Sequence, residues 1–227
     1  MSSHIGTLTE KSLHAELKQH LARPGDRFEI PVDGYVIDIV RANLLIEIQT
    51  GGFTPLKRKF ADLLELGHHI HLVHPIAEQK WIIKETADGK RLDRRKSPRH
   101  GRAVDVFTQL VRIPQLLPLS NFTLEVLLVH QEEVRRNDGQ GSWRRKGWSL
   151  HDHRLLEAVH SVRFNARADY LRYIPADLPR PFTNRQLAKA AGIRTRLAQK
   201  MTYTLHHAGW LERVGKEGNA YLYSEIA

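Results

Sequence analysis

Two acidic side chains, Asp38 and Glu47, flank a short turn early in the chain. Residues 35–40 and 44–49 are rich in aliphatic and β-branched residues, which is typical of two β-strands joined as a hairpin. If the turn is centred on Ala42 and Asn43, Asp38 stands directly opposite Glu47, and opposed residues have Cβ atoms about 4.5–5.5 Å apart. Two carboxylates this close repel each other unless a cation lies between them, so the spacing predicts a site for a hard divalent ion.

Gln49 joins this polar face, because residues two apart in a strand project from the same side. The opposite side carries isoleucines: Ile37, Ile39, Ile46 and Ile48. An ordinary strand with its polar face in solvent is the alternative interpretation. Like charges directly opposite each other destabilise such a solvated pair, which favours the metal site.

A third carboxylate is expected from a helix over residues 7–20, where Leu13, Leu17 and Leu21 recur every four residues. At about 100° per residue, Glu10 falls close to the centre of this apolar stripe. A helix packed on the sheet through that stripe brings Glu10 to the acidic pair. The alternative role of Glu10 is a favourable interaction with the positive N-terminus of its own helix.

Asp38, followed after eight residues by Glu47-Ile48-Gln49, resembles the D-(x)n-E-x-K motif of the PD-(D/E)XK nuclease superfamily, which includes Holliday-junction resolvases and many restriction endonucleases. The resemblance covers about residues 7–84 and includes a helix over 53–66 and a strand over 70–74. It implies the fold of that superfamily, an α/β fold with a mixed sheet flanked by helices. It also implies a metal-dependent endonuclease that hydrolyses phosphodiester bonds of DNA, branched or damaged DNA included.

The same resemblance assigns the site residues. The catalytic residues it implies are Glu10, Asp38, Glu47 and Gln49. Mg²⁺, or Mn²⁺ as its substitute, would be held by Asp38, Glu47 and the backbone carbonyl of Ile48, with Glu10 completing the shell. Such an ion lowers the pKa of a bound water and neutralises charge on the scissile phosphate.

The sequence departs from the superfamily motif at two positions. Ile37 precedes Asp38 where proline is usual, and Gln49 stands where lysine is usual. Glutamine can orient an attacking water but carries no positive charge, so Lys57 or Lys59 on the next helix is expected to supply that charge. In the alternative function, Gln49 marks lost activity, and the chain is a non-catalytic DNA-binding regulator with a degenerate nuclease core.

The order of predicted elements gives an α/β fold. Further elements are expected after the helix and strand just named: a strand over 81–84, a basic, mobile loop over 84–102, a helix over 104–113, a strand over 122–129, a turn over 137–141 and a helix over 150–164. We therefore expect a nuclease-like core over residues 1–84. Residues 85–174 add the basic loop and further α/β elements, and residues 175–227 form a C-terminal domain.

Residues 182–223 resemble a winged helix-turn-helix that follows a proline-rich linker. Four cations of this unit are assigned to DNA: Arg194, Arg196, Lys200 and Lys216. The first three lie at the start of the second helix, over 195–208, which the resemblance implies is a recognition helix for the major groove of DNA. Lys216 lies on the wing, where it would reach the adjacent backbone. A winged helix used for protein contacts or dimerisation is the alternative.

The charge of the chain indicates a polyanionic partner. There are 35 Lys and Arg residues against 25 Asp and Glu residues, which gives a net charge of +10. Further basic residues are assigned to nucleic acid: Arg95, Lys96, Arg99, Arg144, Arg145 and Lys146. The last three lie between Trp143 and Trp148, a mixture that suits stacking on unpaired bases. Two core tryptophans around a solvated basic turn are the alternative.

Several other classes of site are disfavoured. The chain has no cysteine, so thiolate catalysis and zinc fingers are excluded, and a cytoplasmic location is expected. No apolar run is long enough to span a bilayer, so no membrane association is expected. The histidines at 68, 69, 71 and 74 are interpreted as ordinary strand residues, because zinc sites need converging ligands with a second shell. Assembly into a homodimer stays open.

Overall fold

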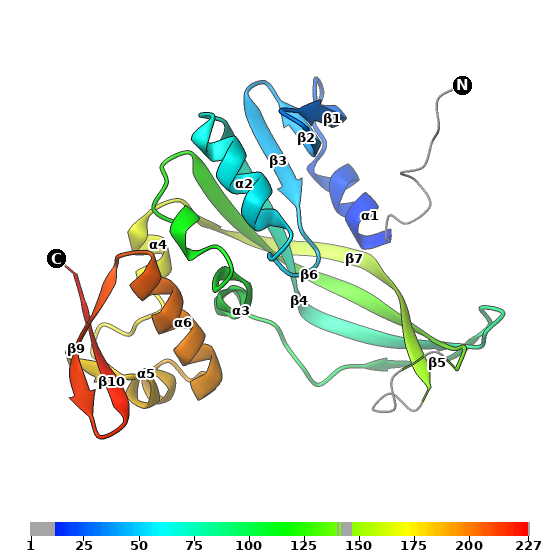
Figure 1. Ribbon diagram of the computed structural model, residues 1–227. Helices are drawn as coiled ribbons and strands as arrows, with labels where there is room; N and C mark the ends of the chain where they lie inside the picture. The colour runs from blue at the N-terminus through cyan, green and yellow to red at the C-terminus, as the bar shows by residue number, and fades with distance from the viewer. Residues whose placement is uncertain (1–11, 140, 142–146, 227) are drawn as a thin grey trace.

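The computed structural model describes residues 12–139, 141 and 147–226, and it shows a mixed α/β protein built on one large sheet (Figure 1). The strands of this sheet are β1 (Arg27–Val32), β2 (Tyr35–Arg41), β3 (Leu44–Ile48), β4 (His69–Glu85), β5 (Arg91–Lys96), β6 (Phe122–Asn137) and β7 (Trp148–Phe164). Their order is β1-β2-β3-β4-β6-β7, with β5 paired to β4 outside this path. The predicted mixed α/β sheet flanked by helices is confirmed.

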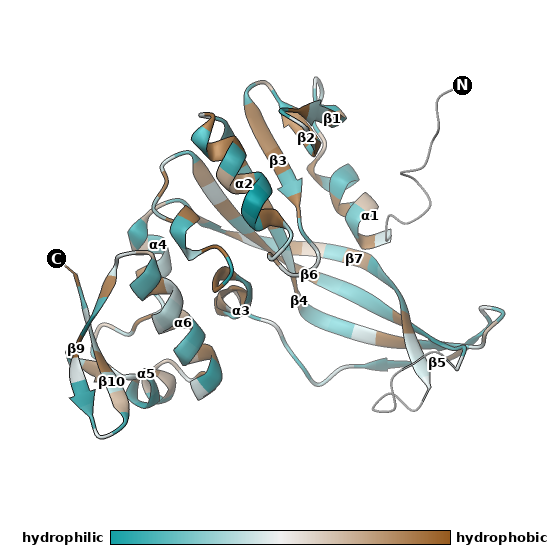
Figure 2. Ribbon diagram, viewed as in Figure 1, coloured by the Kyte–Doolittle hydropathy of each residue, from teal (hydrophilic) through white to brown (hydrophobic). Residues whose placement is uncertain are grey.

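Helices α1 (Ser12–Leu21) and α2 (Leu56–Glu65) lie on opposite faces of the sheet. Leu17 of α1 packs in one cluster with Ile39 and Ile46, whereas Phe60 of α2 packs in the other cluster with Leu45. Adjacent residues of β3 therefore serve different faces, as the alternation of side chains in a strand requires. Apolar residues concentrate on the strands near these helices, and the far parts of β4, β6 and β7 are more hydrophilic (Figure 2).

The far parts of β4, β6 and β7, together with β5, form an arm that extends past the body of the sheet (Figure 1). The strands predicted over 70–74 and 81–84 are one continuous strand, β4, which runs parallel to β6 along almost its whole length. The prediction of a mobile loop over 84–102 is wrong for residues 91–96, which pair antiparallel to Trp81–Glu85 as β5. All six side chains of β5 are exposed, so no apolar alternation marks this strand in the sequence.

The helix predicted over 150–164 is wrong, because these residues form the long strand β7, antiparallel to β6. The register shifts three times along this pair, and each shift leaves one β7 residue without a partner: His151, Leu156 and Val159. Each extra residue in a β-bulge interrupts the two-residue alternation of buried and exposed side chains. The resulting spacing of apolar residues imitates that of a helix, which explains the error.

The helix predicted over 104–113 is also shorter than expected. Residues Ala103–Val106 form a 3₁₀ turn, and a single α-helical turn, α3 (Phe107–Leu110), follows it. The chain then continues in further tight turns, with the N–H of Ile113 bonded to the carbonyl of Leu110. Pro114 starts a second short 3₁₀ helix over Pro114–Leu116, and a residue before proline is disfavoured in the α conformation.

The remaining elements are α4 (Arg167–Leu171), β8 (Phe182–Thr183), α5 (Asn184–Ala190), α6 (Thr195–His207), β9 (Leu211–Glu217) and β10 (Ala220–Glu225). The three strands form a small sheet in the order β8-β10-β9. Thr183 caps α5 by accepting a hydrogen bond from the N–H of Gln186. Ile174, Leu178 and Phe182 are buried in the same apolar cluster as α2 and α3, so the core continues through the proline-rich segment.

Within the described residues, no helix is long and apolar enough to cross a membrane.

Candidate metal centre and nucleic-acid interface

The β2–β3 hairpin has the register expected from a turn centred on Ala42 and Asn43. Ile39 pairs with Ile46 and Arg41 with Leu44, and Asp38 and Glu47 follow directly beyond the last paired residues. Ala42 adopts a positive φ of 51°, which suits a two-residue hairpin turn. The hairpin therefore brings the two acidic residues close together where the pairing of its strands ends.

The two carboxylates replace backbone hydrogen bonds at the point where the strands separate. The N–H of Asp38 donates to Oε1 of Glu47 at 3.3 Å, and the N–H of Ile48 donates to Oδ2 of Asp38 at 2.8 Å. Each side chain is therefore held by the main chain of the opposite strand. The arrangement fixes Asp38, Glu47 and the main chain of Ile48 in one small region, as the sequence predicted.

Each carboxylate is also contacted from a helix. Nε2 of His14 on α1 lies 3.2 Å from Oδ2 of Asp38. Nζ of Lys59 on α2 lies 2.5 Å from Oε1 of Glu47 and donates a second hydrogen bond, of 2.6 Å, to the carbonyl of Val36. Of the two lysines considered from the sequence, Lys59 is the one at the acidic pair, whereas Lys57 is exposed.

The environment shifts the pKa values of the two acids in opposite directions. Burial, and next the charge of Asp38, raise the pKa of Glu47, although Lys59 opposes this; the residue is only 7% exposed. Burial also acts to raise the pKa of Asp38, but hydrogen bonds from His14 and Ile48, with nearby positive charge, outweigh it and lower the pKa. Asp38 is therefore a permanent anion at neutral pH, and Glu47 is an acid whose ionised form depends on a nearby cation.

The donor atoms of this region fit a hard divalent cation. Mg²⁺ usually keeps several waters and binds through one or two carboxylates, and Asp38 and Glu47 provide two. In the described part of the chain, no group of three or more His, Asp or Glu side chains converges. Glu10, the predicted third ligand, lies outside the described residues.

Gln49 lies in the loop after β3, and its side chain is engaged within that loop. Its Nε2 donates to the carbonyl of Gly52 at 2.7 Å. Its main-chain oxygen lies 2.5 Å from Nδ1 of His74, a buried residue whose pKa is lowered by burial and which is therefore neutral. Gln49 must leave Gly52 before its amide can orient a water beside Glu47.

Sequence reasoning missed His14 and His74 as members of this region. His14 lies four residues after Glu10, a spacing that puts two residues on one helix face, and this was the available signal. His74 had been interpreted only as a strand residue. Of the other histidines, His68 lies 2.6 Å from Asp33 and His71 lies 2.9 Å from Glu125, so both pair with carboxylates.

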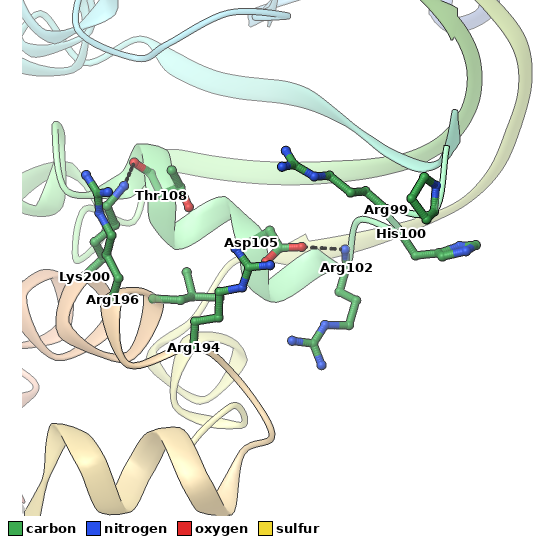
Figure 3. Close-up of a pocket in the computed structure, with 10 residues that line it drawn as sticks. Arg99, His100, Arg102, Asp105, Thr108, Arg194, Arg196 and Lys200 are labelled. Atoms are coloured by element: carbon green, nitrogen blue, oxygen red, sulfur yellow. Dashed lines mark hydrogen bonds between the residues drawn. The ribbon is translucent and has the colours of Figure 1, made fainter. Parts of the chain in front are cut away.

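A second region of interest is a groove of about 720 Å³ between residues 98–108 and the start of α6, which we call the basic groove (Figure 3). Its cationic lining residues are Arg99, Arg102, Arg194, Arg196 and Lys200, and His100 lies beside them. The acidic residue in the lining is Asp105, whose carboxylate accepts a 2.8 Å hydrogen bond from the N–H of Arg102. Four residues predicted to bind nucleic acid, from two distant parts of the sequence, thus meet in one groove.

The basic groove and the acidic pair lie on two sides of α3. The carbonyl of Thr108 accepts a hydrogen bond from Lys200 across the groove at 3.4 Å. The next residue is Gln109. It lies beside the loop that contains Gln49 and Gly52, because a Cβ added to Gly52 would be 3.5 Å from the side-chain oxygen of Gln109. One helical turn therefore separates the groove from the loop that follows Glu47.

Three other residues predicted to bind nucleic acid, all in the described part of the chain, lie apart from this groove. Arg95 and Lys96 are exposed on β5 in the arm, where Nζ of Lys96 lies 5.7 Å from the centre of the Trp81 ring. Lys216 lies on β9, 4.9 Å from the ring of Tyr221. The basic residues at 144–146 lie outside the described part of the chain.

Comparison with known proteins gives a family and one distant relative. A protein of Treponema pallidum (strain Nichols), described as uncharacterized, is 28% identical over 221 residues, which cover 96% of this chain and 86% of the relative. The similarity therefore extends over the acidic pair, the basic groove and α6. No solved structure matches the chain. Residues 11–165, from α1 to the end of β7, match the family described as "Domain of unknown function (DUF8091)", and the chain belongs to this family.

Proposed function

We propose that this protein is a metal-dependent deoxyribonuclease of the PD-(D/E)XK type, which hydrolyses phosphodiester bonds with Mg²⁺. The observation that carries the proposal is that Asp38 and Glu47 meet where the pairing of β2 with β3 ends, with Lys59 2.5 Å from Glu47. Two acids and one lysine in one region reproduce the chemistry of the D-(x)n-E-x-K motif. The lysine comes from α2 instead of from position 49.

The residues of the chain have separable roles in this proposal. Asp38 and Glu47, with the carbonyl of Ile48 and with Glu10, hold the ion. When bound, Mg²⁺ lowers the pKa of a water and offsets charge on the scissile phosphate. His14 and the N–H of Ile48 keep Asp38 ionised through the hydrogen bonds described above.

Lys59 and Gln49 share the role of the usual motif lysine. Lys59 supplies an ammonium that stabilises the negative charge which develops on the phosphate. Gln49 is the polar group closest in sequence to Glu47 on the same strand edge, and it orients the attacking water once it leaves Gly52. This division of roles accounts for the absence of lysine at position 49.

The C-terminal elements support a DNA substrate. We propose that the unit β8-α5-α6-β9-β10 is a winged helix, as its element order suggests, and that it helps to bind DNA. Its second helix brings Arg194, Arg196 and Lys200 into the basic groove. A groove lined by many cations and one hydrogen-bonded acid suits a phosphate backbone.

One observation favours a second candidate function, a DNA-binding regulator without catalysis. His14 already contacts Asp38, Lys59 already pairs with Glu47, and Gln49 is already bonded to Gly52. A site in this state is stable without an ion. In that case the acidic pair only holds the hairpin between α1 and α2, and the basic groove alone carries the function.

Cleavage assays separate the two functions. Full-length protein is incubated with supercoiled plasmid and with branched DNA in the presence of Mg²⁺, Mn²⁺ or EDTA. The nuclease predicts nicking with either metal and none in EDTA, with loss of cleavage but not of DNA binding in Glu47→Gln. The matched control is Glu65→Gln, because Glu65 is an exposed glutamate of α2 away from the site. DNA binding without cleavage under every metal would establish the regulator instead.

A further inference from the structure

The first turns of α6 face another part of the chain and are not open on both sides. Lys200 donates to the carbonyl of Thr108, and the guanidinium of Arg102 donates to the carbonyl of Gly192, each at 3.4 Å. An α-helix is about 10–12 Å across and the major groove of B-DNA is about 12 Å wide. A helix with a second segment packed along its flank is too wide for that groove, so this geometry disfavours insertion of α6 into duplex DNA.

The cations of the basic groove lie on two walls that face each other. Arg99 and Arg102 come from the segment after β5, whereas Arg194, Arg196 and Lys200 come from α6 and the residue before it (Figure 3). Among the residues that the structure describes, none of these five forms an ion pair with an acid. Burial, and next the charges of Arg196 and Arg112, lower the pKa of Lys200, as expected where cations crowd together.

The groove continues into a second hollow of about 440 Å³. The two share Arg196 and Lys200, and the second hollow adds Arg112 and Tyr203. Tyr203 is 42% exposed, and its ring lies 4.2 Å from that of His207, centre to centre. An exposed aromatic ring therefore stands at the end of a track of cations.

We propose that the basic groove and this second hollow bind a single strand of DNA, with phosphates on Arg99, Arg196 and Lys200 and a base stacked on Tyr203. Single-strand sites combine a positive groove along the backbone with aromatic side chains under the bases. A single strand reaches the bottom of a groove with two cationic walls, whereas a duplex does not. The inference rests on the proposed function, because it names the form of DNA that lies next to α3 and the loop after Glu47.

The test is fluorescence anisotropy with full-length protein in EDTA, so that cleavage plays no part. The probes are a labelled oligothymidylate of about 15 nucleotides, within the size range of single-strand sites, and a duplex of the same length. Two variants reverse one charge on each wall, Arg99→Glu and Arg196→Glu, and a third is Tyr203→Ala. Lys189→Glu is the matched control, since Lys189 is an exposed cation of α5 outside the groove.

We expect the single strand to bind more tightly than the duplex. Each charge reversal should flatten the slope of log K against log salt by about 0.7 or more, the value for one phosphate contact on a single strand. Tyr203→Ala should weaken binding about tenfold, a typical effect of losing one stacked base. Lys189→Glu should change neither quantity, and melting curves should show all variants folded.

Two other results would overturn the inference, and they differ in what they say of the proposed function. If the duplex binds more tightly, and Lys216→Glu weakens duplex binding more than Arg99→Glu does, the C-terminal unit binds duplex DNA through its wing. The groove is then not a site for single-stranded DNA. If neither form of DNA binds at low salt, the deoxyribonuclease itself is wrong. Should one charge-reversed variant fail to fold, the variant on the opposite wall and Tyr203→Ala still decide the outcome.

Discussion

Replacement of Lys59 by alanine removes the ammonium that lies 2.5 Å from the carboxylate of Glu47. The side chains of Lys59 and Glu47 are 15% and 9% exposed, so the acid is left buried and uncompensated. Removing one partner of a buried ion pair costs about 3–5 kcal/mol, and we expect about 3 kcal/mol because Glu47 can take up a proton. For a protein of this size, that corresponds to a decrease in Tm of about 6–12 °C.

The loss should depend on pH in a defined direction. In the folded protein, burial and Asp38 raise the pKa of Glu47, so ionisation of this residue opposes folding. That cost is absent below the pKa that Glu47 has in the unfolded chain, and it grows as pH rises through the pKa that Glu47 has in the folded protein. Without Lys59 the folded pKa is higher still, so the deficit of Lys59→Ala should be large near about pH 8 and smaller near about pH 5.

Urea unfolding at the two pH values measures this effect. Lys57→Ala, an exposed lysine of the same helix, is the control and should change stability by less than about 0.5 kcal/mol. In a Glu47→Gln background, Lys59→Ala should cost much less, because no buried charge remains. The reasoning is refuted if Lys59→Ala loses the same stability at both pH values and in both backgrounds.

Three further predictions concern other parts of the molecule. His71, whose Nε2 lies 2.9 Å from the carboxylate, is the largest cause that lowers the pKa of Glu125, to about 2 from an ordinary value of 4.5, so this acid should contribute stability above pH 4.5 that is lost as pH falls toward 2. Urea unfolding against pH should show a weaker acid dependence in Glu125→Gln, and an unchanged dependence would contradict this. Gly101→Ala should lower the Tm and weaken DNA binding, because its Cβ would lie 2.5 Å from a main-chain oxygen of β4. Gly215→Ala should do neither, because its Cβ would meet only the side chain of Leu222 at an ordinary contact distance of 3.9 Å. Gln49→Ala should slow cleavage by about 10²–10⁴-fold without stopping it, as for a group that positions water, and Gln49→Lys should preserve or raise the rate; arrest in both variants would assign Gln49 another role.

The hairpin was predictable because local rules determine it. A two-residue turn fixes the register of its strands, and the register fixes which side chains are opposed. The position of Asp38 relative to Glu47 therefore followed from counting residues. The partners of these acids could not be found by counting residues, because His14 and Lys59 reach the site only through the packing of α1 and α2 on opposite faces of the sheet.

The arm and the groove depend on contacts between distant segments, and the sequence showed them poorly. Bulges in β7 disturb the alternation that marks a strand, and β5 has no buried side chain at all. The sequence predicts nucleic-acid binding both for the basic residues near Arg99 and for those near Arg196. Their convergence in one groove, on two facing walls, follows only from the contact of α3 with α6.

The central claim is that Asp38 and Glu47 together bind a divalent cation, and thermal unfolding with and without Mn²⁺ tests it most directly. A ligand at 100 times its Kd stabilises the folded state by about 2.7 kcal/mol. This corresponds to an increase in Tm of about 5–10 °C for the wild-type protein. In Asp38→Asn, which keeps an oxygen to accept the N–H of Ile48, the increase should be absent. An equal increase in both proteins, or none in the wild type at millimolar Mn²⁺, would contradict the claim.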